Sequence, residues 1–600
     1  MNAQEAIKYI ENYTWSTTRL GLERTRALLR ALGDPQKDLK FIHVAGSNGK
    51  GSTCAMLDSV LRSAGYRTGL YTSPYIQGFC ERMRVDGENI PGDALCRITE
   101  RVRDIADTMA DHPSQFELVT AIAMEYFREA ACDIVVLEVG MGGALDSTNV
   151  IDCPEAAVIT NIGLEHTEYL GNTLTEIAAA KGGIIKPGCA VVCYESEPEV
   201  TETITNICAE QGARFTLSEA EDVTAVSASL DVQCFLWKGK EYAIPLLGAH
   251  QLRNAAVALE TIEQLLGRGW VISESAVREG LAATAWPARF EALSRSPLFI
   301  LDGGHNPQCA EALAQNLRDY LPDQKVTFLM GVLADKDFEE MLSAIAPFAE
   351  QFICVTPESP RALPAALLCE RLRERGLSAQ SFDTIPDGIR AALQTGGPVI
   401  AFGSLYLAGR VRTLFPAIIK KHQRTSALRA RDAIPAEARK EKSAVICERI
   451  RASLAYREAS TIMLFKAFRS EVDLSLLEQF APLDGKKLFY PYCVGKHQML
   501  ALYPNSDADW ELDDYGIRVP ILERSQMIPP PRIDLVICPC SAFDGEGHRL
   551  GMGAGYYDWF LPQCVNAKKI IAAFEAQRME QVFTDPWDVV MDSVITEYTE

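Results

Sequence analysis

The chain carries one stretch whose residue types suit phosphate binding: Gly46-Ser47-Asn48-Gly49-Lys50-Gly51-Ser52-Thr53. It follows a short apolar run and precedes a helix-like segment, the context in which backbone amides and a helix N-terminus hold phosphate oxygens. Glycines let the backbone approach closely, Lys50 would neutralise charge on the outer phosphates, and Ser52 could reach Mg²⁺. The stretch therefore predicts an ATP site.

Short apolar runs and longer amphipathic stretches alternate around this loop. The runs FIHVAG, TGLYTSP, DIVVLEVG and AAVITNIG resemble strands, and TCAMLDSVLRSAG resembles a helix. This alternation predicts a parallel sheet covered on both faces. A second α/β series starts near Pro297, and a third follows the basic segment 420–442. We expect an ATP-binding domain over 1–294, a smaller α/β domain over 295–420 and a third α/β domain over 421–600.

The composition argues against several kinds of partner. The formal net charge over 600 residues is −21, whereas a nucleic-acid or anionic-membrane surface needs a concentrated positive field. No apolar run reaches the roughly 18 residues that span a bilayer, and the first residues lack an apolar signal core. The 17 cysteines are scattered, without a C-x-x-C pair at zinc-finger spacing. We expect a cytoplasmic protein with no obligate protein partner.

The spacing of the phosphate loop, G-x-x-G-K-G-S, resembles that of folylpolyglutamate synthases and the related Mur ligases. Further stretches resemble the synthases in the same order, among them TSPYIQGFCER from Thr72, GLEHTEYLG from Gly163 and LDGGHNP from Leu301. The resemblance covers residues 1–420. It implies an α/β fold with a P-loop, Mur-ligase-like parallel sheet and a smaller Rossmann-like domain, ATP and Mg²⁺ as cofactors, and folates and L-glutamate as substrates.

The same resemblance implies roles for individual residues. Mg²⁺ ligands are expected at Ser73, Glu138 and His166, and Lys181 would carry a carbamate near a second metal ion. Mg²⁺ prefers oxygen ligands, and Glu138 ends an apolar run, where ligands collect in parallel sheets. Lys50, Lys181 and His305 would serve catalysis. The other implied contacts are Asn254 with adenine, Arg289 with the phosphates, Asp302 with the ribose, and Lys336 and Asp337 with glutamate.

The chemistry implied is activation of a carboxylate by ATP. Lys50, Arg289 and Mg²⁺ would stabilise charge as the γ-phosphoryl group moves to a folate carboxylate, and the amine of glutamate would attack the acyl phosphate. Ala144 and Tyr75 stand where the family often has arginine and histidine. These departures leave open whether dihydropteroate, tetrahydrofolate or both are accepted.

Two other classes of protein share parts of this pattern. A Mur-type ligase of cell-wall precursors has the same loop and the same carbamylated lysine. A non-catalytic ATP-binding regulator would predict damage at Lys50, Glu138, His166 or Lys181, and all four are intact. The folate interpretation is favoured because TSPYIQGFCER and LDGGHNP are both present.

A second glycine-rich stretch, HRLGMGAGYYD, follows an apolar strand-like run near the C-terminus. A basic residue followed by glycines suits a backbone that wraps a polyphosphate, with Arg549 as a bidentate partner. By itself the stretch is equally typical of a flexible surface loop.

The stretch 534–561 resembles the 5-formyltetrahydrofolate cyclo-ligase family, also called methenyltetrahydrofolate synthetase, and so do SALRARDAIPAEARKEKSAVI, FRSEVDLSLL and DSVITE. This resemblance covers residues 425–600 and implies a three-layer α/β domain that uses ATP to close a ring in 5-formyltetrahydrofolate. It assigns Glu471 and Tyr557 to the folate. The implied ATP and Mg²⁺ residues are Arg429, Arg549, Gly551, Gly553, Gly555, Tyr556 and Asp558.

The C-terminal stretch also departs from the pattern of that family. The lysine usual three places before the Leu-Arg pair is Thr425, with Arg424 beside it. The family's Gly-Ile-x-Glu-Pro stretch has Val519 in place of the glutamate, and its His-Asp pair reads Trp587-Asp588. Arginine and lysine differ in reach and geometry. A folate-binding module without turnover is therefore the alternative for this domain.

Overall fold

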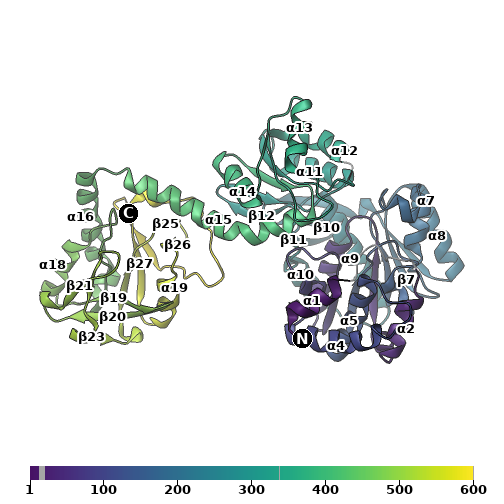
Figure 1. Ribbon diagram of the computed structural model, residues 1–600, viewed down its shortest axis with the longest axis horizontal. Coiled ribbons are helices and arrows are strands. Elements are labelled where there is room, and N and C mark those ends of the chain that lie inside the picture. The colour runs from purple at the N-terminus through teal and green to yellow at the C-terminus, as the bar shows by residue number, and fades with distance from the viewer. Residues whose placement is uncertain (13–20, 337, 599–600) are drawn as a thin grey trace. The chain divides into compact units, whose positions relative to one another are not determined.

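The computed structural model describes residues 1–12, 21–336 and 338–598 (Figure 1). It divides into two compact units. The first comprises 1–292, 300–385 and 399–412, and the second comprises 293–299, 386–398 and 413–600. The three predicted domain ranges, with boundaries at 294 and 420, stay a prediction.

The first unit is built on an eight-stranded sheet, with strand order β4-β3-β2-β5-β1-β6-β7-β8. Strands β2, β5, β1, β6, β7 and β8 pair in parallel, and β3 and β4 add an antiparallel edge. In chain order the strands are β1 Phe41–Ala45, β2 Thr68–Tyr71, β3 Met83–Val85, β4 Glu88–Asn89, β5 Ile134–Glu138, β6 Ala156–Ile159, β7 Ala190–Tyr194 and β8 Arg214–Ser218.

Helices cover both faces of this sheet. Successive strand residues point to opposite faces, and apolar side chains on each face pack against helices. Ile42 and Val44 of β1 pack with α3, α9 and α10, whereas Phe41 packs with α4 and α5 on the other face. The helices of this layer are α1 Ala3–Glu11, α2 Glu23–Ala31, α3 Lys50–Ser63, α4 Gly92–Ala106, α5 Gln115–Glu129, α6 Thr167–Leu170, α7 Leu174–Gly182, α8 Pro198–Gln211, α9 Ala249–Gly267 and α10 Glu274–Ala282.

Two further sheets follow along the chain. The smaller is antiparallel and has the order β11-β10-β9, formed by β9 Val223–Ala228, β10 Gln233–Trp237 and β11 Lys240–Ile244. The other has the order β12-β13-β17-β14-β15-β16, formed by β12 Glu291–Arg295, β13 Leu298–Leu301, β14 Val326–Met330, β15 Ala349–Cys354, β16 Ala379–Ser381 and β17 Val399–Phe402. Its helices are α11 Pro307–Tyr320, α12 Phe338–Ile345, α13 Ala365–Glu374 and α14 Ile385–Gln394.

A 28-residue helix, α15 Leu405–Asp432, continues through the start of the basic segment 420–442. The change of composition at residue 420 therefore lies within a helix and does not mark its end. The basic residues there lie on a helix whose buried positions include Gln423, Ala427 and Arg431.

The second unit contains a seven-stranded sheet of order β23-β20-β19-β18-β24-β27-β28. Its parallel centre is packed on both faces: Ile462 and Ile537 contact α16 and α18, and Met463 and Val536 contact the segment after α19. The strands are β18 Thr461–Met463, β19 Lys487–Gly495, β20 Gln498–Pro504, β23 Ser525–Ile528, β24 Leu535–Cys538, β27 Lys568–Ala572 and β28 Ser593–Ile595. The helices are α16 Ala436–Ala452, α17 Leu454–Glu458, α18 Ser475–Leu483 and α19 Tyr556–Phe560.

Two short antiparallel pairs complete this unit. β21 Trp510–Leu512 pairs with β22 Arg518–Pro520, and β25 Ala542–Phe543 pairs with β26 Arg549–Leu550. The predicted fold class is confirmed for all three α/β regions, because each has a sheet with a parallel centre and helices packed on it.

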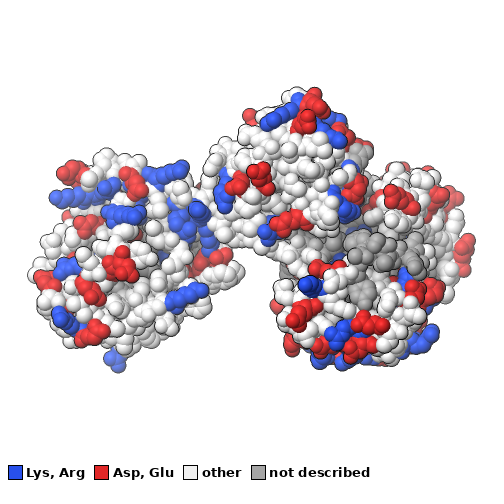
Figure 2. All heavy atoms as spheres, in the orientation of Figure 1, with Lys and Arg blue, Asp and Glu red and all other residues white. Residues whose placement is uncertain are grey.

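Among the described residues, no helix has the length and apolar character needed to cross a bilayer. On the face that Figure 2 shows, acidic and basic side chains alternate over the first unit. That face therefore presents no broad positive surface there.

Candidate active sites

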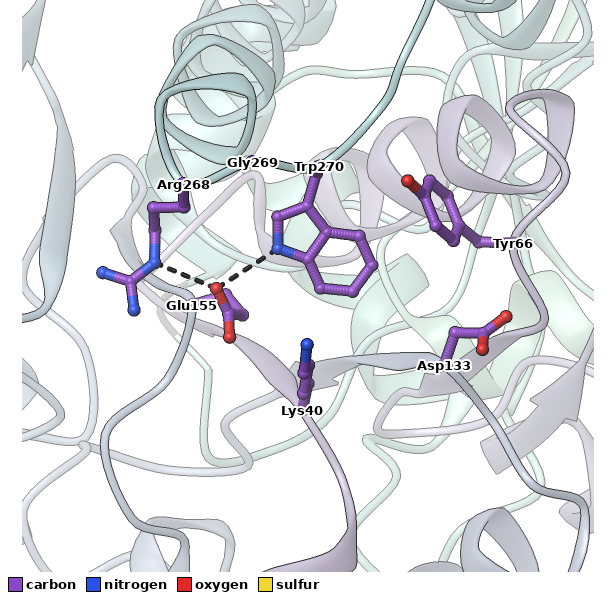
Figure 3. Close-up of a pocket in the computed structure, with 7 residues that line it drawn as sticks. All are labelled: Lys40, Tyr66, Asp133, Glu155, Arg268, Gly269 and Trp270. Carbon is purple, nitrogen blue, oxygen red and sulfur yellow. Dashed lines mark hydrogen bonds and ion pairs between the residues drawn. The ribbon is translucent and has the colours of Figure 1, made fainter.

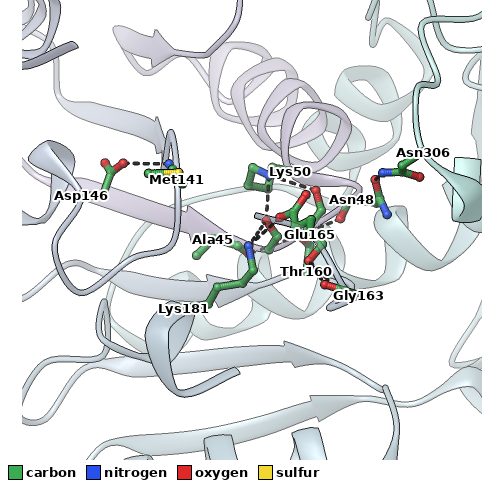
Figure 4. A network of polar contacts seen from close by, with 12 residues as sticks. Ala45, Asn48, Lys50, Met141, Asp146, Thr160, Gly163, Glu165, Lys181 and Asn306 are labelled. Carbon is green, nitrogen blue, oxygen red and sulfur yellow. Dashed lines mark hydrogen bonds and ion pairs between the residues drawn. The ribbon is translucent and has the colours of Figure 1, made fainter. Parts of the chain in front are cut away.

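The phosphate loop connects the carboxyl end of β1 to the N-terminus of α3. Gly49 caps the helix with a φ of 89°, a left-handed conformation that favours glycine. Lys50 donates hydrogen bonds from Nζ to the carbonyl oxygens of Gly46 (2.7 Å) and Ser47 (3.0 Å). Figure 4 shows Lys50 within the polar network around the loop. Ser52 and Thr53 are buried in the first turn of α3. The loop thus places Lys50 and the N-terminus of α3 together, as phosphate binding requires, while the Ser47 and Asn48 amides donate to the Asn161 carbonyl oxygen.

Lys181 reaches the phosphate loop from α7. Its buried Nζ donates to the Gly46 carbonyl oxygen (2.8 Å) and to Oε1 of Glu165 (2.8 Å). Burial lowers the pKa of Lys181 to about 8 although Glu165 opposes this shift. Burial would raise the pKa of Glu165, but Lys50 and Lys181 together lower it to about 2. Glu165 was not among the predicted site residues, although it directly precedes His166.

The predicted metal ligands lie at the carboxyl edge of the same sheet. Glu138, the last residue of β5, is buried and accepts a hydrogen bond from the Ser73 amide (3.1 Å). Burial raises the pKa of Glu138 to about 7 against the opposing charge of Lys50. His166 caps α6 with a φ of 50°, and burial lowers its pKa. No group of three or more His, Cys, Asp or Glu side chains in the described ranges is arranged to hold a metal ion.

A cation nevertheless fits the chemistry of this edge. A buried carboxylate whose pKa is raised by burial has little compensation for its negative charge, and a bound cation would provide it. The predicted ligands include a serine hydroxyl and a modified lysine. Such a set does not need a cluster of three His, Cys, Asp or Glu side chains. The residues present therefore fit Mg²⁺.

The N-terminus of α11 contacts the phosphate loop. Asn306, the N-cap of α11, donates from Nδ2 to Oδ1 of Asn48 (3.0 Å) (Figure 4). Nδ2 of Asn48 in turn donates to Oε1 of Gln308 (2.6 Å). These contacts join segments that are far apart in the sequence: Asn48 and Gln308 are separated by 260 positions. Neither α11 residue was predicted to belong to the site.

Two glycines of the loop leave space for neighbouring side chains. A Cβ atom on Gly49 would lie 2.5 Å from Oδ1 of Asn254, the residue predicted to contact adenine. A Cβ atom on Gly51 would lie 2.8 Å from the ring of Trp286. The second glycine of G-K-G-S is therefore required by the tryptophan that packs against it.

Substitution of Gly51 by alanine should destabilise the protein by about 1–3 kcal/mol, because the added methyl group overpacks the contact with Trp286. Thermal unfolding and ATP binding measure the effect. Gly267→Ala, at the end of α9 with nothing within 4 Å of the added methyl group, is the matched control and should be neutral or slightly stabilising. Equal stability of the two variants would contradict the packing argument.

Four further predicted residues lie around this site. Asp302 follows β13 and accepts hydrogen bonds from the amides of Phe290 (3.0 Å) and Gly304 (2.7 Å). Nδ1 of His305 lies 3.1 Å from the Gly303 carbonyl oxygen, and burial lowers its pKa to about 4. Besides burial, the charges of Lys336 and Arg289 also lower the pKa of His305. Asp337 lies outside the described residues.

The hollow in Figure 3 lies at the opposite edge of the sheet. It has a volume of about 680 Å³, and Lys40, Asp133 and Glu155 line it just before β1, β5 and β6 begin. Glu155 accepts hydrogen bonds from Arg268 (2.9 Å) and Trp270 (3.2 Å), and Lys40 lies over the Trp270 ring. These contacts join residues at the N-terminal ends of the strands to the segment after α9. The hollow is separate from the phosphate loop, which lies at the carboxyl ends of the strands.

The second candidate site surrounds the glycine loop of the second unit. Arg549 is buried on β26 and donates from Nη2 to Oδ1 of Asp558 (2.7 Å), which lies on α19. The Arg549 guanidinium lies 5.4 Å from the ring centre of Tyr557, and within the described ranges its buried Nε has no hydrogen-bond partner. Tyr556 begins α19 after Gly555, whose φ of 72° is left-handed.

The two arginines near residue 425 differ in their environment. Arg424 is half-buried and donates from Nε to the Gly551 carbonyl oxygen (2.7 Å), and its guanidinium lies 3.7 Å from a Cβ built on Gly553. Arg429, the predicted ATP residue, is exposed, and the described part of the chain gives its guanidinium no hydrogen bond or ion pair. Arg424 is therefore the arginine that the fold places at the glycine loop.

We expect Arg424→Gln to raise the KM for ATP in methenyltetrahydrofolate formation about tenfold or more, because hydrogen bonds to charged groups contribute about 1.5–3 kcal/mol. Arg429→Gln, made for comparison, should have a smaller effect. Steady-state kinetics with ATP as the varied substrate measure both. A larger effect of Arg429→Gln would assign the phosphate contact to Arg429 and contradict this placement.

The fold and the first site define an ATP-dependent ligase of the Mur class. The family model of the Mur ligase middle domain matches residues 44–262, and that of the Mur ligase glutamate ligase domain matches residues 288–405. Folylpolyglutamate synthase of Lacticaseibacillus casei is 36% identical over 433 residues, covering 69% of this chain and 98% of that protein. Over this part the chain belongs to the folylpolyglutamate synthase family, as its sequence predicted.

Other relatives agree with this assignment. Dihydrofolate synthase/folylpolyglutamate synthase of Bacillus subtilis is 33% identical over 425 residues, covering 68% of this chain and 98% of that protein. The E. coli FolC structure in complex with DHPP and ADP is 32% identical with a TM-score of 0.62, covering 70% of this chain and 98% of that chain. Residues 418–597 match the 5-formyltetrahydrofolate cyclo-ligase family, which confirms the predicted fusion.

Proposed function

We propose that the chain is a bifunctional folate enzyme of the cytoplasm. Its first activity is the ATP-dependent addition of L-glutamate to a folate, and its second is the ATP-dependent conversion of 5-formyltetrahydrofolate to 5,10-methenyltetrahydrofolate. The first proposal rests on Lys50 and Lys181, whose Nζ atoms both donate to the Gly46 carbonyl oxygen, with Glu165 accepting from Lys181 and Glu138 buried at the end of β5. The 17 free cysteines support a reducing compartment.

In the first activity, the residues of the loop bind and orient the phosphates of ATP. Lys50 and Arg289 neutralise the charge that develops as the γ-phosphoryl group moves to the folate carboxylate. Ser73, Glu138 and His166 would hold Mg²⁺, which when bound supplies positive charge at the phosphates. The lowered pKa of Lys181 increases the share of neutral amine, the form that reacts with CO₂ to give a carbamate.

In the second half of this reaction, the amine of glutamate attacks the acyl phosphate and releases phosphate. His305 and Lys336 lie on the side of the smaller α/β region, where glutamate is expected, and the contact of α11 with Asn48 holds that region against the phosphate loop. The contact supports alignment of the amine with the activated carbonyl, and exclusion of water from it. We propose that Lys336 and Asp337 bind glutamate and that His305 takes part in catalysis.

In the second activity, ATP phosphorylates the formyl oxygen, and nitrogen 10 of the folate closes the ring as phosphate leaves. Arg549 and the glycine loop would bind the phosphates, Asp558 would hold Mg²⁺, and Glu471 and Tyr557 would face the folate. This proposal rests on buried Arg549, whose Nε–H group has no acceptor in the part of the chain that the structure describes.

One pair of assays tests both activities. Purified protein is supplied with ATP, labelled glutamate and either tetrahydrofolate or dihydropteroate, and the label is followed into folate product. Absence of incorporation with both acceptors would sink the first proposal, and the comparison of acceptors decides whether dihydropteroate is a substrate. Methenyltetrahydrofolate absorbance from 5-formyltetrahydrofolate and ATP tests the second. Folate binding without turnover would instead favour a non-catalytic module.

A further inference from the structure

Glu471 lies in a strained turn between β18 and α18. The Phe468 amide donates to Oε2 of Glu471 (3.0 Å), and the Glu471 amide donates to the Phe468 carbonyl oxygen (3.2 Å). Between them, Arg469 has a φ of 56°, a left-handed conformation that costs energy for a residue other than glycine. The turn directs the Glu471 side chain inward, where it is 11% exposed.

The last turn of α15 holds this strained turn in place. Arg431 donates from Nε to Oγ of Ser470 (3.0 Å), and Oγ of Ser470 in turn donates to Oδ1 of Asp432. Asp432, Ser470 and Arg431 thus form a continuous chain of hydrogen bonds between the helix and the turn. Strained backbone persists where its surroundings over-determine it, and this chain supplies that constraint.

The remaining edge of Arg431 faces Glu471. Arg431 is 3% exposed, and its Nη1 lies 3.8 Å from Oε1 of Glu471. That distance is too long for a hydrogen bond, and Nη1 is buried without a hydrogen-bond partner among the described residues. A buried guanidinium with an unused N–H group is costly unless a nearby anion compensates its charge, and Glu471 is the carboxylate at hand.

The surroundings of Glu471 belong to the second candidate site. Arg431 faces it from α15. Burial raises the pKa of Tyr557 on α19 and of Cys540 after β24, and the negative charge of Glu471 adds to both increases. Burial raises the pKa of Glu471 itself, and Arg431 opposes this shift. Among the groups that act on Glu471, Arg431 is thus the cation that favours its ionised form.

We propose that Arg431 is a positioning residue of the folate site, which fixes Glu471 as an ionised acceptor for the N–H groups of 5-formyltetrahydrofolate. The proposal rests on the proposed second activity. The sequence resemblance assigned Glu471 to the folate but gave no role to Arg431. Loss of Arg431 should weaken folate binding and leave ATP binding intact, because the glycine loop and Arg549 are unchanged.

The test is a pH series of KM values for 5-formyltetrahydrofolate and for ATP, followed by methenyltetrahydrofolate absorbance. Arg431→Gln should raise the folate KM about tenfold, equivalent to about 1.4 kcal/mol, with the ATP KM within about twofold of the native value. Without the cation the pKa of Glu471 rises, so the loss of folate affinity on acidification should begin at higher pH. Arg431→Lys should restore part of the affinity and of the pH profile.

Two further variants keep the test informative. Ser470→Ala removes the hydrogen-bond chain and keeps the guanidinium, so it should raise the folate KM in the same direction by a smaller factor, and it carries the test if Arg431→Gln does not fold. Arg532→Gln, at an exposed arginine of the same unit, is the control and should change neither KM. Parallel rises of both KM values, or an unchanged pH profile, would overturn the proposal.

The outcome also separates this proposal from the proposed function. Native protein that forms methenyltetrahydrofolate while Arg431→Gln behaves identically overturns only the role of Arg431. If native protein shows no turnover, direct titration with 5-formyltetrahydrofolate replaces the kinetics, and weaker binding by Arg431→Gln would still support the role. Native protein that neither turns over nor binds the folate overturns both proposals.

Discussion

Replacement of Lys50 by alanine should lower the rate of glutamate addition by about 10²–10³-fold, the loss typical when one preorganised donor to a developing negative charge is removed. The Lys50 ammonium group lies within the loop, 2.7 Å from the Gly46 carbonyl oxygen, and no other lysine of the described chain donates to the Ser47 carbonyl. The measurement is incorporation of labelled glutamate at saturating ATP.

The same variant should form methenyltetrahydrofolate at the native rate, because the second site uses its own arginine and glycine loop. Lys37→Ala, at an exposed lysine that pairs with Asp34, is the matched control and should leave both activities unchanged. Loss of both activities in Lys50→Ala would indicate that the two sites are coupled or that the chain misfolds. Native glutamate addition would show that the loop does not serve this reaction.

The phosphate loop and its sheet could be predicted from the sequence because their signals are local. Strand, glycines, Lys50 and helix are contiguous, and strand residues that alternate between two packed helix layers read as continuous apolar runs. The partners of the loop are not local. Glu165 becomes relevant only when α7 brings Lys181 to it, and Asn306 reaches Asn48 across 258 positions. No spacing in the sequence encodes those approaches.

In the second unit, α15 brings to the site two arginines that were not among the predicted site residues. Arg424 and Arg431 are seven residues apart, which places them on the same side of a helix of 3.6 residues per turn, whereas Arg429 is five residues from Arg424 and points elsewhere. The change of composition at residue 420 predicts a boundary, whereas the helical periodicity runs through it. A helix continuous to Asp432 makes Arg424 and Arg431 neighbours of the site and leaves Arg429 exposed.

Replacement of Arg549 by alanine should lower methenyltetrahydrofolate formation by at least about 10²-fold and leave glutamate addition unchanged. Arg549 is buried beside the glycine loop and pairs with Asp558 through Nη2, and no described residue accepts a hydrogen bond from its Nε. A planar guanidinium in that position can bind two phosphate oxygens at once. The measurement is the initial rate of methenyltetrahydrofolate absorbance at saturating ATP and folate.

The partner of Arg549 makes a control for folding necessary. Removal of one member of a buried ion pair is destabilising by about 3–5 kcal/mol, although Asp558 is 17% exposed and part of this loss is screened. Arg549→Lys keeps the charge and the pair with Asp558 but loses the planar fork, so it should fold and still lose rate. If Arg549→Lys is fully active and Arg549→Ala loses rate only in proportion to its unfolded fraction, Arg549 stabilises the domain and does not bind phosphate. A loss of rate in folded Arg549→Lys would instead assign the fork to the phosphates of ATP.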